Sequence, residues 1–133
     1  MDNPRILITG ANGQIGTVLV KTLRERYGIE NVIATDLVHS EMEGPFEIVN
    51  VLDTDRIQSV IETYKITEIY HLAALLSSKG EQKIELTWDI NLNAYLSILN
   101  LALKHGIKKI FFPSTIGVFG PTTPRQNTPQ DTP

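Results

Sequence analysis

The feature that most constrains this chain is a glycine-rich segment that joins a short apolar run to an amphipathic one. The run over residues 5–9 ends at Gly10, and two further glycines follow at Gly13 and Gly16. From Gln14 onward, apolar residues recur at the spacing of a helix. The pattern predicts a buried strand, a tight glycine turn and a helix, which together begin a βα unit.

The same alternation of short strands and longer helices continues along the chain. Further strands are predicted at 31–36, 46–49, 68–72 and 109–112, with helices from Gln14 to Gly28, after Asp53 as N-cap, and over about 84–105 with Gly106 closing it. Helices of this length between strands require crossover connections. We therefore predict an α/β fold over residues 1–120, a Rossmann-type doubly wound parallel sheet of five strands in order 3-2-1-4-5. The Pro-rich residues 121–133 lack periodicity and are predicted to be a loop.

Two helices carry more specific expectations. In the first, we expect the apolar face to comprise Ile15, Val18, Leu19 and Leu23, with Lys21, Arg24 and Glu25 on the opposite side. The helix over 84–105 is apolar nearly all round, so it must be covered on two sides. The sheet covers one side, and either the rest of a larger domain or a partner subunit covers the other.

The composition excludes several classes of protein. The 133 residues suffice for one domain, and the net charge of −3 provides no sequence-independent attraction for nucleic acid. The chain has no cysteine, and His39, His71 and His105 lack metal-ligand spacing, so no metal is expected. His71, inside a predicted strand, is expected in the core or beside a cofactor. No apolar stretch reaches the roughly 20 residues of a membrane helix, so we expect a soluble, cytoplasmic protein.

Gly10, Gly13 and Gly16 stand where a phosphate-binding turn requires them. Backbone N–H groups at a helix N-terminus attract an anion, and glycine lets the backbone approach without a Cβ in the way. A ligand-free turn has the same spacing, so the triplet alone is a weak signal. Asp36 strengthens it, because a carboxylate ending the second strand accepts hydrogen bonds from both ribose hydroxyls and repels a 2′-phosphate. The pair predicts NAD rather than NADP.

Three further segments follow predicted strands, at the edge where ligands bind in such sheets. Residues 50–51 lie where an adenine ring is expected, although a helix-start turn explains them equally well. Residues 72–74 are small enough to pass close to a cofactor ribose, or are ordinary strand-end packing. The hydroxyls of residues 114–115 are placed to form a hydrogen bond with a substrate oxygen that changes charge. A simple cap of the loop is the alternative interpretation.

Taken in order, these motifs resemble the extended short-chain dehydrogenase/reductase family, which includes nucleotide-sugar epimerases and dehydratases. The motifs are Ile-Leu-Ile-Thr-Gly-Ala-Asn-Gly-Gln-Ile-Gly at 6–16, Thr-Asp at 35–36, His-Leu-Ala-Ala at 71–74, Asn91, and Pro-Ser-Thr-Ile-Gly-Val-Phe-Gly at 113–120. Segments 44–47, 69–77, 80–81, 88–89, 118–124 and 127–129 are similar to the epimerase-like L-threonine 3-dehydrogenases. Those enzymes oxidise threonine to 2-amino-3-ketobutyrate with NAD.

The resemblance implies a role for each matching residue. Thr115 matches the family's catalytic Ser/Thr, with Ser114 as its neighbour, and Ser77 lies where the substrate pocket is expected. Many relatives carry aspartate where Asn50 stands. The helix over 84–105 matches one that the family uses in a two-fold interface, so a homodimer is expected. Contacts to NAD are expected from Gly10, Asn12, Gly13, Gln14, Ile15, Gly16, Asp36, Asn50, Val51, Leu72, Ala73, Ala74 and Asn91.

The resemblance also implies a catalytic tyrosine and lysine in a YxxxK motif beyond the Pro-rich loop, with the tyrosine as base. None of Tyr27, Tyr64, Tyr70 and Tyr95 has a lysine four residues on. We therefore expect the N-terminal part of a longer enzyme, truncated before its C-terminal part and inactive alone. Two alternatives to the threonine dehydrogenase stay open, namely a nucleotide-sugar epimerase or dehydratase and an NAD-binding module without catalysis.

Overall fold

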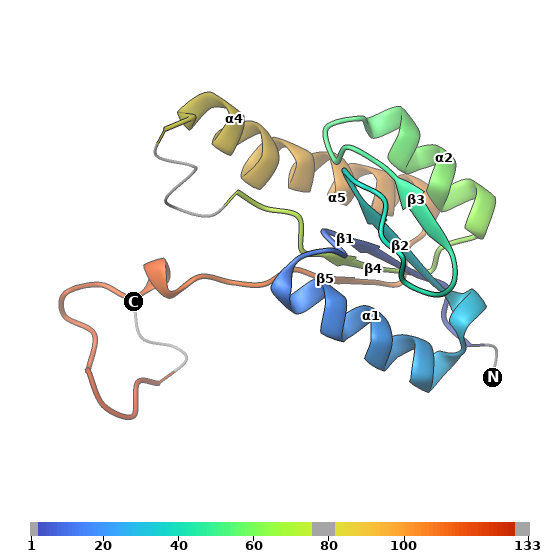
Figure 1. The fold of residues 1–133 in the computed structure, drawn as a ribbon. Coiled ribbons are helices and arrows are strands. Elements are labelled where there is room, and N and C mark those ends of the chain that lie inside the picture. Colours follow the sequence, from blue (N-terminus) through green and yellow to red (C-terminus); the bar gives the residue numbers. More distant parts are fainter. Residues whose placement is uncertain (1–2, 76–81, 130–133) are drawn as a thin grey trace.

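A parallel sheet with helices on both faces organises the chain (Figure 1). The structure is a computed structural model that describes residues 3–75 and 82–129. The strands are β1 (Ile6–Thr9), β2 (Val32–Asp36), β3 (Phe46–Ile48), β4 (Glu68–His71) and β5 (Lys109–Phe111). Their order is β3-β2-β1-β4-β5 and every pair is parallel, which confirms the predicted topology.

The helices divide between the two faces of the sheet. Helix α1 (Gln14–Tyr27) lies on one face, while α2 (Thr54–Tyr64) and α5 (Ala94–His105) lie on the other (Figure 1). Short 3-10 helices, η1 (Ile29–Asn31) and η3 (Ile116–Val118), occupy two connections. This arrangement confirms the doubly wound fold. Residues 121–129 contain no helix or strand.

Strand side chains alternate between two cores, because successive residues of a strand point to opposite faces. Ile6, Ile8 and Val32 pack with Val20 and Leu23 of α1. The other cluster, on the α2 and α5 side, comprises Leu7, Ile33, Val49, Ile57, Val60, Ile61, Ile66, Ile69, Ile98 and Leu101. The central strands β1 and β2 are therefore buried on both faces, as their continuous apolar sequence predicts.

The predicted helix over 84–105 is continuous but not uniform. It consists of α4 (Ile84–Trp88), a π-helical turn η2 (Asp89–Asn93) and α5. Gly106 ends α5 with φ +65°, a left-handed conformation that glycine adopts without strain. At the start of α2, the Asp53 carboxylate accepts a hydrogen bond of 2.9 Å from the Arg56 N–H, which confirms the predicted N-cap.

The predicted faces of α1 are wrong in its first half and at Arg24. Ile15 and Val18 are 61% and 66% exposed, whereas Arg24 is only 7% exposed. The Arg24 guanidinium donates to the carbonyls of Val32 (3.1 and 3.3 Å), Pro45 (2.6 Å) and Glu43. Burial lowers the pKa of Arg24, and nearby Glu30 and Glu43 oppose that shift. Arg24 thus belongs to the buried side, because the carbonyl oxygens there accept the hydrogen bonds that its guanidinium would otherwise make with water.

None of the helices in the described ranges combines the length and the apolarity that a bilayer crossing requires.

Replacing Arg24 with methionine is expected to lower the free energy of unfolding by about 2–3 kcal/mol, because the three carbonyls lose a charged donor. Urea denaturation of the whole protein measures this change. The matched control is Arg26→Met, since Arg26 is exposed and lies over the Tyr27 ring, 5.3 Å from its centroid. That control is expected to change stability by less than about 0.5 kcal/mol. Equal losses in the two variants would contradict the role of Arg24.

Candidate functional site

Two cavities lie side by side along the carboxyl ends of the strands. The first, of about 350 Å³, is lined by Gly10, Asn12, Gly13, Asp36, Leu37, Val49, Asn50, Val51, Leu72, Ala73, Ala74, Leu75 and Ile90. The second, of about 720 Å³, is lined by Ile15, His71, Leu72, Ala73, Ala74, Leu75, Asn91, Phe112, Pro113, Ser114 and Thr115. Residues 72–75 line both cavities, so the segment after β4 is a wall that the two cavities share. Open parallel sheets bind their ligands at this edge.

The glycine turn forms one wall of the first cavity. Gly10 has φ +71°, and a Cβ on it would lie 2.7 Å from the Ala73 nitrogen, so only glycine is accommodated. A Cβ on Gly16 would collide with the carbonyl oxygens of Gly10 and Ala11. Gly13 is the N-cap of α1 and supplies no side-chain cap to the first turn. The turn therefore leaves the N-terminus of α1, with Gln14 and Ile15, without a side-chain cap that would compete with an anion.

Asp36 ends β2 and joins the glycine turn to the loop that follows. Its carboxylate accepts hydrogen bonds from the backbone N–H groups of Asn12 (2.9 Å) and Leu37 (2.7 Å). The Asn12 amide in turn donates to the Val38 carbonyl (2.7 Å). These contacts hold a partly exposed carboxylate at the rim of the first cavity, where it can accept further hydrogen bonds from a hydroxylated ligand.

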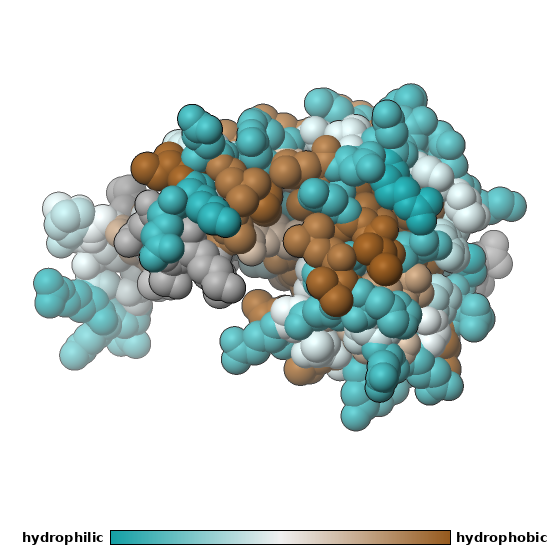
Figure 2. All heavy atoms as spheres, turned by 45° about the horizontal axis from the view of Figure 1, so that its top comes forward, coloured by the Kyte–Doolittle hydropathy of each residue, from teal (hydrophilic) through white to brown (hydrophobic). Residues whose placement is uncertain are grey.

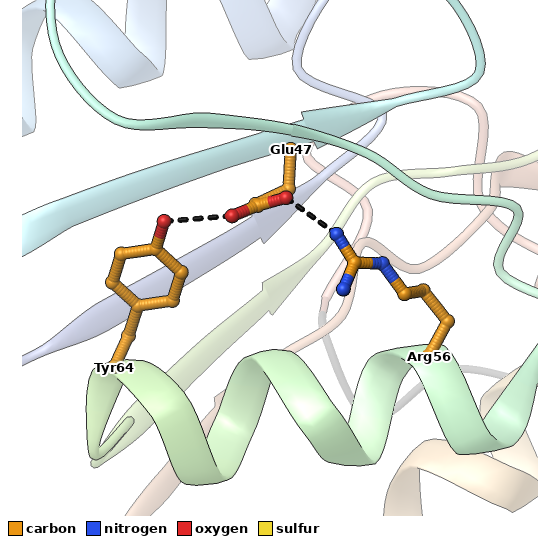
Figure 3. A network of polar contacts seen from close by, with 3 residues as sticks. All are labelled: Glu47, Arg56 and Tyr64. Atoms are coloured by element: carbon orange, nitrogen blue, oxygen red, sulfur yellow. Dashed lines mark hydrogen bonds and ion pairs between the residues drawn. The ribbon is translucent and has the colours of Figure 1, made fainter.

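A polar network joins β3 to α2, the two elements between which residues 49–51 lie. Glu47 accepts hydrogen bonds from Arg56 (2.6 Å) and Tyr64 (2.7 Å), which reach it from two points along α2 (Figure 3). The bond to Glu47, together with burial, raises the pKa of Tyr64. Asn50 uses its side-chain oxygen to accept from the Leu52 N–H at 3.0 Å, so it forms a local turn. Residues 49–51 therefore line the first cavity on a braced segment.

Asn91 braces the segment after β4 from the opposite side. Its amide donates to the Leu75 carbonyl (3.0 Å) and accepts from the Leu75 N–H (2.8 Å), as a paired strand would. Asn91 belongs to the π-helical turn η2, and such turns are frequent at functional sites. It lines the second cavity and not the first. The structure therefore places Asn91 as a support of the cavity wall.

His71 is a buried polar residue at the base of the second cavity. Its Nδ1 lies 2.7 Å from Thr9 Oγ1, and its Nε2 has no partner in the described part of the chain. Burial lowers the pKa of His71 to about 4, so the ring is neutral at pH 7. This confirms the core position, one of the two that the sequence leaves open for His71.

Ser114 and Thr115 follow β5 and are exposed in the second cavity. The Thr115 hydroxyl accepts a hydrogen bond of 3.1 Å from the Gly117 N–H, which orients it within a local turn. Ser77, the predicted substrate contact, lies outside the described residues.

The structure brings most of the predicted site residues together and adds others. Gln14 and Gly16 shape the turn without lining either cavity, whereas Ile15 lines the second. Sequence reasoning missed a mainly apolar set, namely Leu37, Val49, Leu75, Ile90, Phe112 and Pro113. Of these, Leu37, Val49, Phe112 and Pro113 end or directly follow predicted strands, which is the signal that could have found them. Ile90 carried no such signal, because only the packing of η2 brings it to the cavity.

A larger cavity of about 930 Å³ lies between α1 and residues 42–43, and it contains none of the predicted site residues. Within the residues that the structure describes, no group of three or more His, Asp or Glu residues is placed to hold a metal ion.

Known proteins are similar to this chain in sequence and in structure. An uncharacterized epimerase/dehydratase of Staphylococcus epidermidis is 46% identical in an alignment of 131 residues that covers 95% of this chain and 41% of that relative. The holo form of the GalE-like L-threonine dehydrogenase from Cupriavidus necator is 44% identical with a TM-score of 0.91, covering 97% of this chain and 43% of that one. The UDP-glucose 4-epimerase of Thermus thermophilus in complex with NAD is 29% identical with a TM-score of 0.73, covering 84% and 37%.

Each of these matches covers most of this chain but less than half of the other protein. The chain spans about 41% of the length of the curated relative that it matches. Residues 6–133 match the model of the NAD dependent epimerase/dehydratase family. The chain therefore belongs to the NAD dependent epimerase/dehydratase family.

Proposed function

We propose that this chain is the NAD-binding part of an L-threonine 3-dehydrogenase, with residues 121–133 leading to the substrate-binding part. The observation that carries the proposal is its likeness to the Cupriavidus necator enzyme, at 44% identity and a TM-score of 0.91. The UDP-glucose 4-epimerase of Thermus thermophilus is the less similar protein, at 29% and 0.73. Threonine dehydrogenation is therefore the first candidate function, and sugar epimerisation is the second.

In this proposal, NAD lies along the carboxyl ends of the strands. The N–H groups at the start of α1 receive the pyrophosphate, because they carry no side-chain cap and the glycines admit close approach. Asp36 accepts hydrogen bonds from the adenosine ribose, and residues 50–51 flank the adenine. Residues 72–74 line the path toward the second cavity, where the substrate is held.

The second cavity supplies the polar groups for the substrate. Bound NAD would supply the hydride acceptor for oxidation of the threonine hydroxyl. The Thr115 hydroxyl, already oriented by Gly117, holds the reacting oxygen by a hydrogen bond. A tyrosine base and its lysine are expected from the part of the protein beyond this chain.

The Asp36→Ala variant of the whole protein is expected to bind NAD about ten- to a hundredfold more weakly, because the ribose loses a charged acceptor. NADP binding is expected to change much less, since removal of the carboxylate also removes its repulsion of the 2′-phosphate. Titration calorimetry with both cofactors measures the difference. Asp55→Asn, an exposed change on α2 outside both cavities, is the control. An equal loss for the two cofactors would count against the role of Asp36.

With L-threonine and NAD, the whole protein is expected to form NADH, followed by absorbance. Thr115→Val is expected to lower kcat about a hundredfold or more, because the reacting oxygen loses a donor. Ser114→Ala, its neighbour in the same cavity, is the matched control and is expected to retain most activity. Interconversion of UDP-glucose and UDP-galactose without NADH formation would instead establish the second candidate function.

An apolar stripe along α4, η2 and α5 favours a homodimer. The stripe comprises Trp88, Leu92, Leu96 and Leu103, which are 62%, 40%, 46% and 85% exposed. Figure 2 shows hydrophobic side chains gathered on the side of the molecule that carries these helices. The opposite side of α5 is occupied, since Ile98 and Leu101 pack in the core with α2. We propose that a second copy of the protein covers the stripe, because four large apolar side chains exposed along one run of helices are typical of an interface between proteins.

The double variant Leu96→Glu/Leu103→Glu is expected to be monomeric, because carboxylates cannot be buried unpaired between two copies. Size-exclusion chromatography with light scattering measures the mass. Ile48→Glu places the same charge on β3, where Ile48 is 57% exposed, and serves as the control. A double variant with the same mass as the wild type would refute the stripe as an interface.

A further inference from the structure

A buried polar pair joins the two central strands at the edge where the cavities lie. Thr9 ends β1 and His71 ends β4, and the two residues are direct partners in the parallel pairing. Thr9 Oγ1 and His71 Nδ1 lie 2.7 Å apart, and the two residues are 0% and 1% exposed. A hydrogen bond shielded from water to this degree holds its geometry more firmly than an exposed one.

The pair acts on two backbone segments, namely the glycine turn at the first cavity and the segment after β4 that lines both cavities. Thr9 directly precedes Gly10, and His71 precedes Leu72 and Ala73. The Ala73 N–H also points to Thr9 Oγ1, at 3.4 Å, and the Leu72 N–H donates to the Thr9 carbonyl at 3.1 Å. The absent Cβ of Gly10 would lie 2.7 Å from the Ala73 nitrogen, so the two segments are in direct contact. The Thr9 hydroxyl, next to the glycine turn, thus contacts both His71 and the segment after β4.

Two aromatic rings hold the imidazole in this position. His71 stacks on Tyr95 of α5 and on Phe112 after β5, with centroid distances of 5.9 and 5.8 Å and interplanar angles of 7° and 18°. Tyr95 and Phe112 stack on each other at 4.0 Å. The imidazole therefore has little freedom to turn away from Thr9, since neighbours from two parts of the chain oppose it.

The Thr9 hydroxyl can serve both neighbours at once. Its oxygen has two lone pairs and one proton, so it faces the Ala73 N–H and pairs with His71 Nδ1 in either tautomer of the neutral ring. Nδ1, and not Nε2, is the atom through which His71 acts on the backbone.

We propose that Thr9 and His71 are positioning residues, whose hydrogen bond holds the Ala73 peptide against Gly10 in the arrangement that binds NAD. This role rests on the proposed function, since it acts on the same two cavities. Neither residue is proposed to take part in the chemistry. The pair instead sets how well formed the dinucleotide site is before the cofactor arrives, and preorganisation of this kind appears as affinity.

The test uses two pairs of variants in the whole protein, with NAD affinity measured by calorimetry at a temperature where each variant is folded. Thr9→Val removes the hydroxyl and keeps the shape, whereas Thr9→Ser keeps the hydroxyl. His71→Asn places an amide near the Nδ1 position, whereas His71→Gln places it near the Nε2 position. Thr9→Val and His71→Gln are expected to raise the NAD dissociation constant about five- to tenfold, as expected for loss of one hydrogen bond. Thr9→Ser and His71→Asn are expected to stay within about twofold of the wild type.

Thermal unfolding of the same variants separates positioning from a purely structural role. A lowered Tm with an unchanged NAD dissociation constant in Thr9→Val and His71→Gln would overturn the proposal. Where Thr9→Val fails to fold, the comparison of His71→Asn with His71→Gln carries the test, and equal affinities in those two would also overturn it. A wild-type protein without NAD affinity would overturn the proposed function and this role together, whereas binding that is insensitive to all four changes would overturn only this role.

Discussion

The contact between the Gly10 backbone and the Ala73 peptide is the constraint on which the rest of the site depends. A side chain at position 10 would overlap that peptide, so the glycine turn and the end of β4 approach each other only because the Cβ is absent. The segment 72–75 then lies between two cavities and lines both.

Buried polar groups stabilise this arrangement at points where apolar packing would not specify it. Arg24 donates to three carbonyls around the start of β2 and the loop before β3, and His71 pairs with Thr9 between β1 and β4. Burial has different consequences for the charges of Arg24 and His71. Arg24 keeps its charge because carbonyl oxygens surround it, whereas His71 stays neutral because burial lowers its pKa to about 4.

The side chains that stabilise the loops around the cavities form hydrogen bonds with backbone groups or with neighbouring elements. They do so without closing the cavities. Asn91 pairs with both backbone groups of Leu75, and Asn12 donates to the Val38 carbonyl. Glu47 connects β3 to α2 through Arg56 and Tyr64 (Figure 3). Loops braced in this way lose little further freedom on binding, which favours affinity for an extended ligand.

The sequence by itself determined the alternation of strands and helices, the glycine turn, the N-cap at Asp53 and the position of Asp36 at the end of β2. These features follow from local pattern and spacing, which act over a few residues and are visible in the chain. It placed Ile15, Val18 and Arg24 on the wrong faces of α1, because the spacing of Ile15 and Val18 resembles that of core residues and the partners of Arg24 lie 8 to 21 residues away. Only the tertiary structure decided the burial of Arg24 and the pairing of Thr9 with His71 across 62 residues. It also decided the hydrogen bonds between Asn91 and the backbone of Leu75. Each of these is a contact between side chains or backbone groups brought together by the crossing of strands and helices, and no local spacing encodes such a crossing.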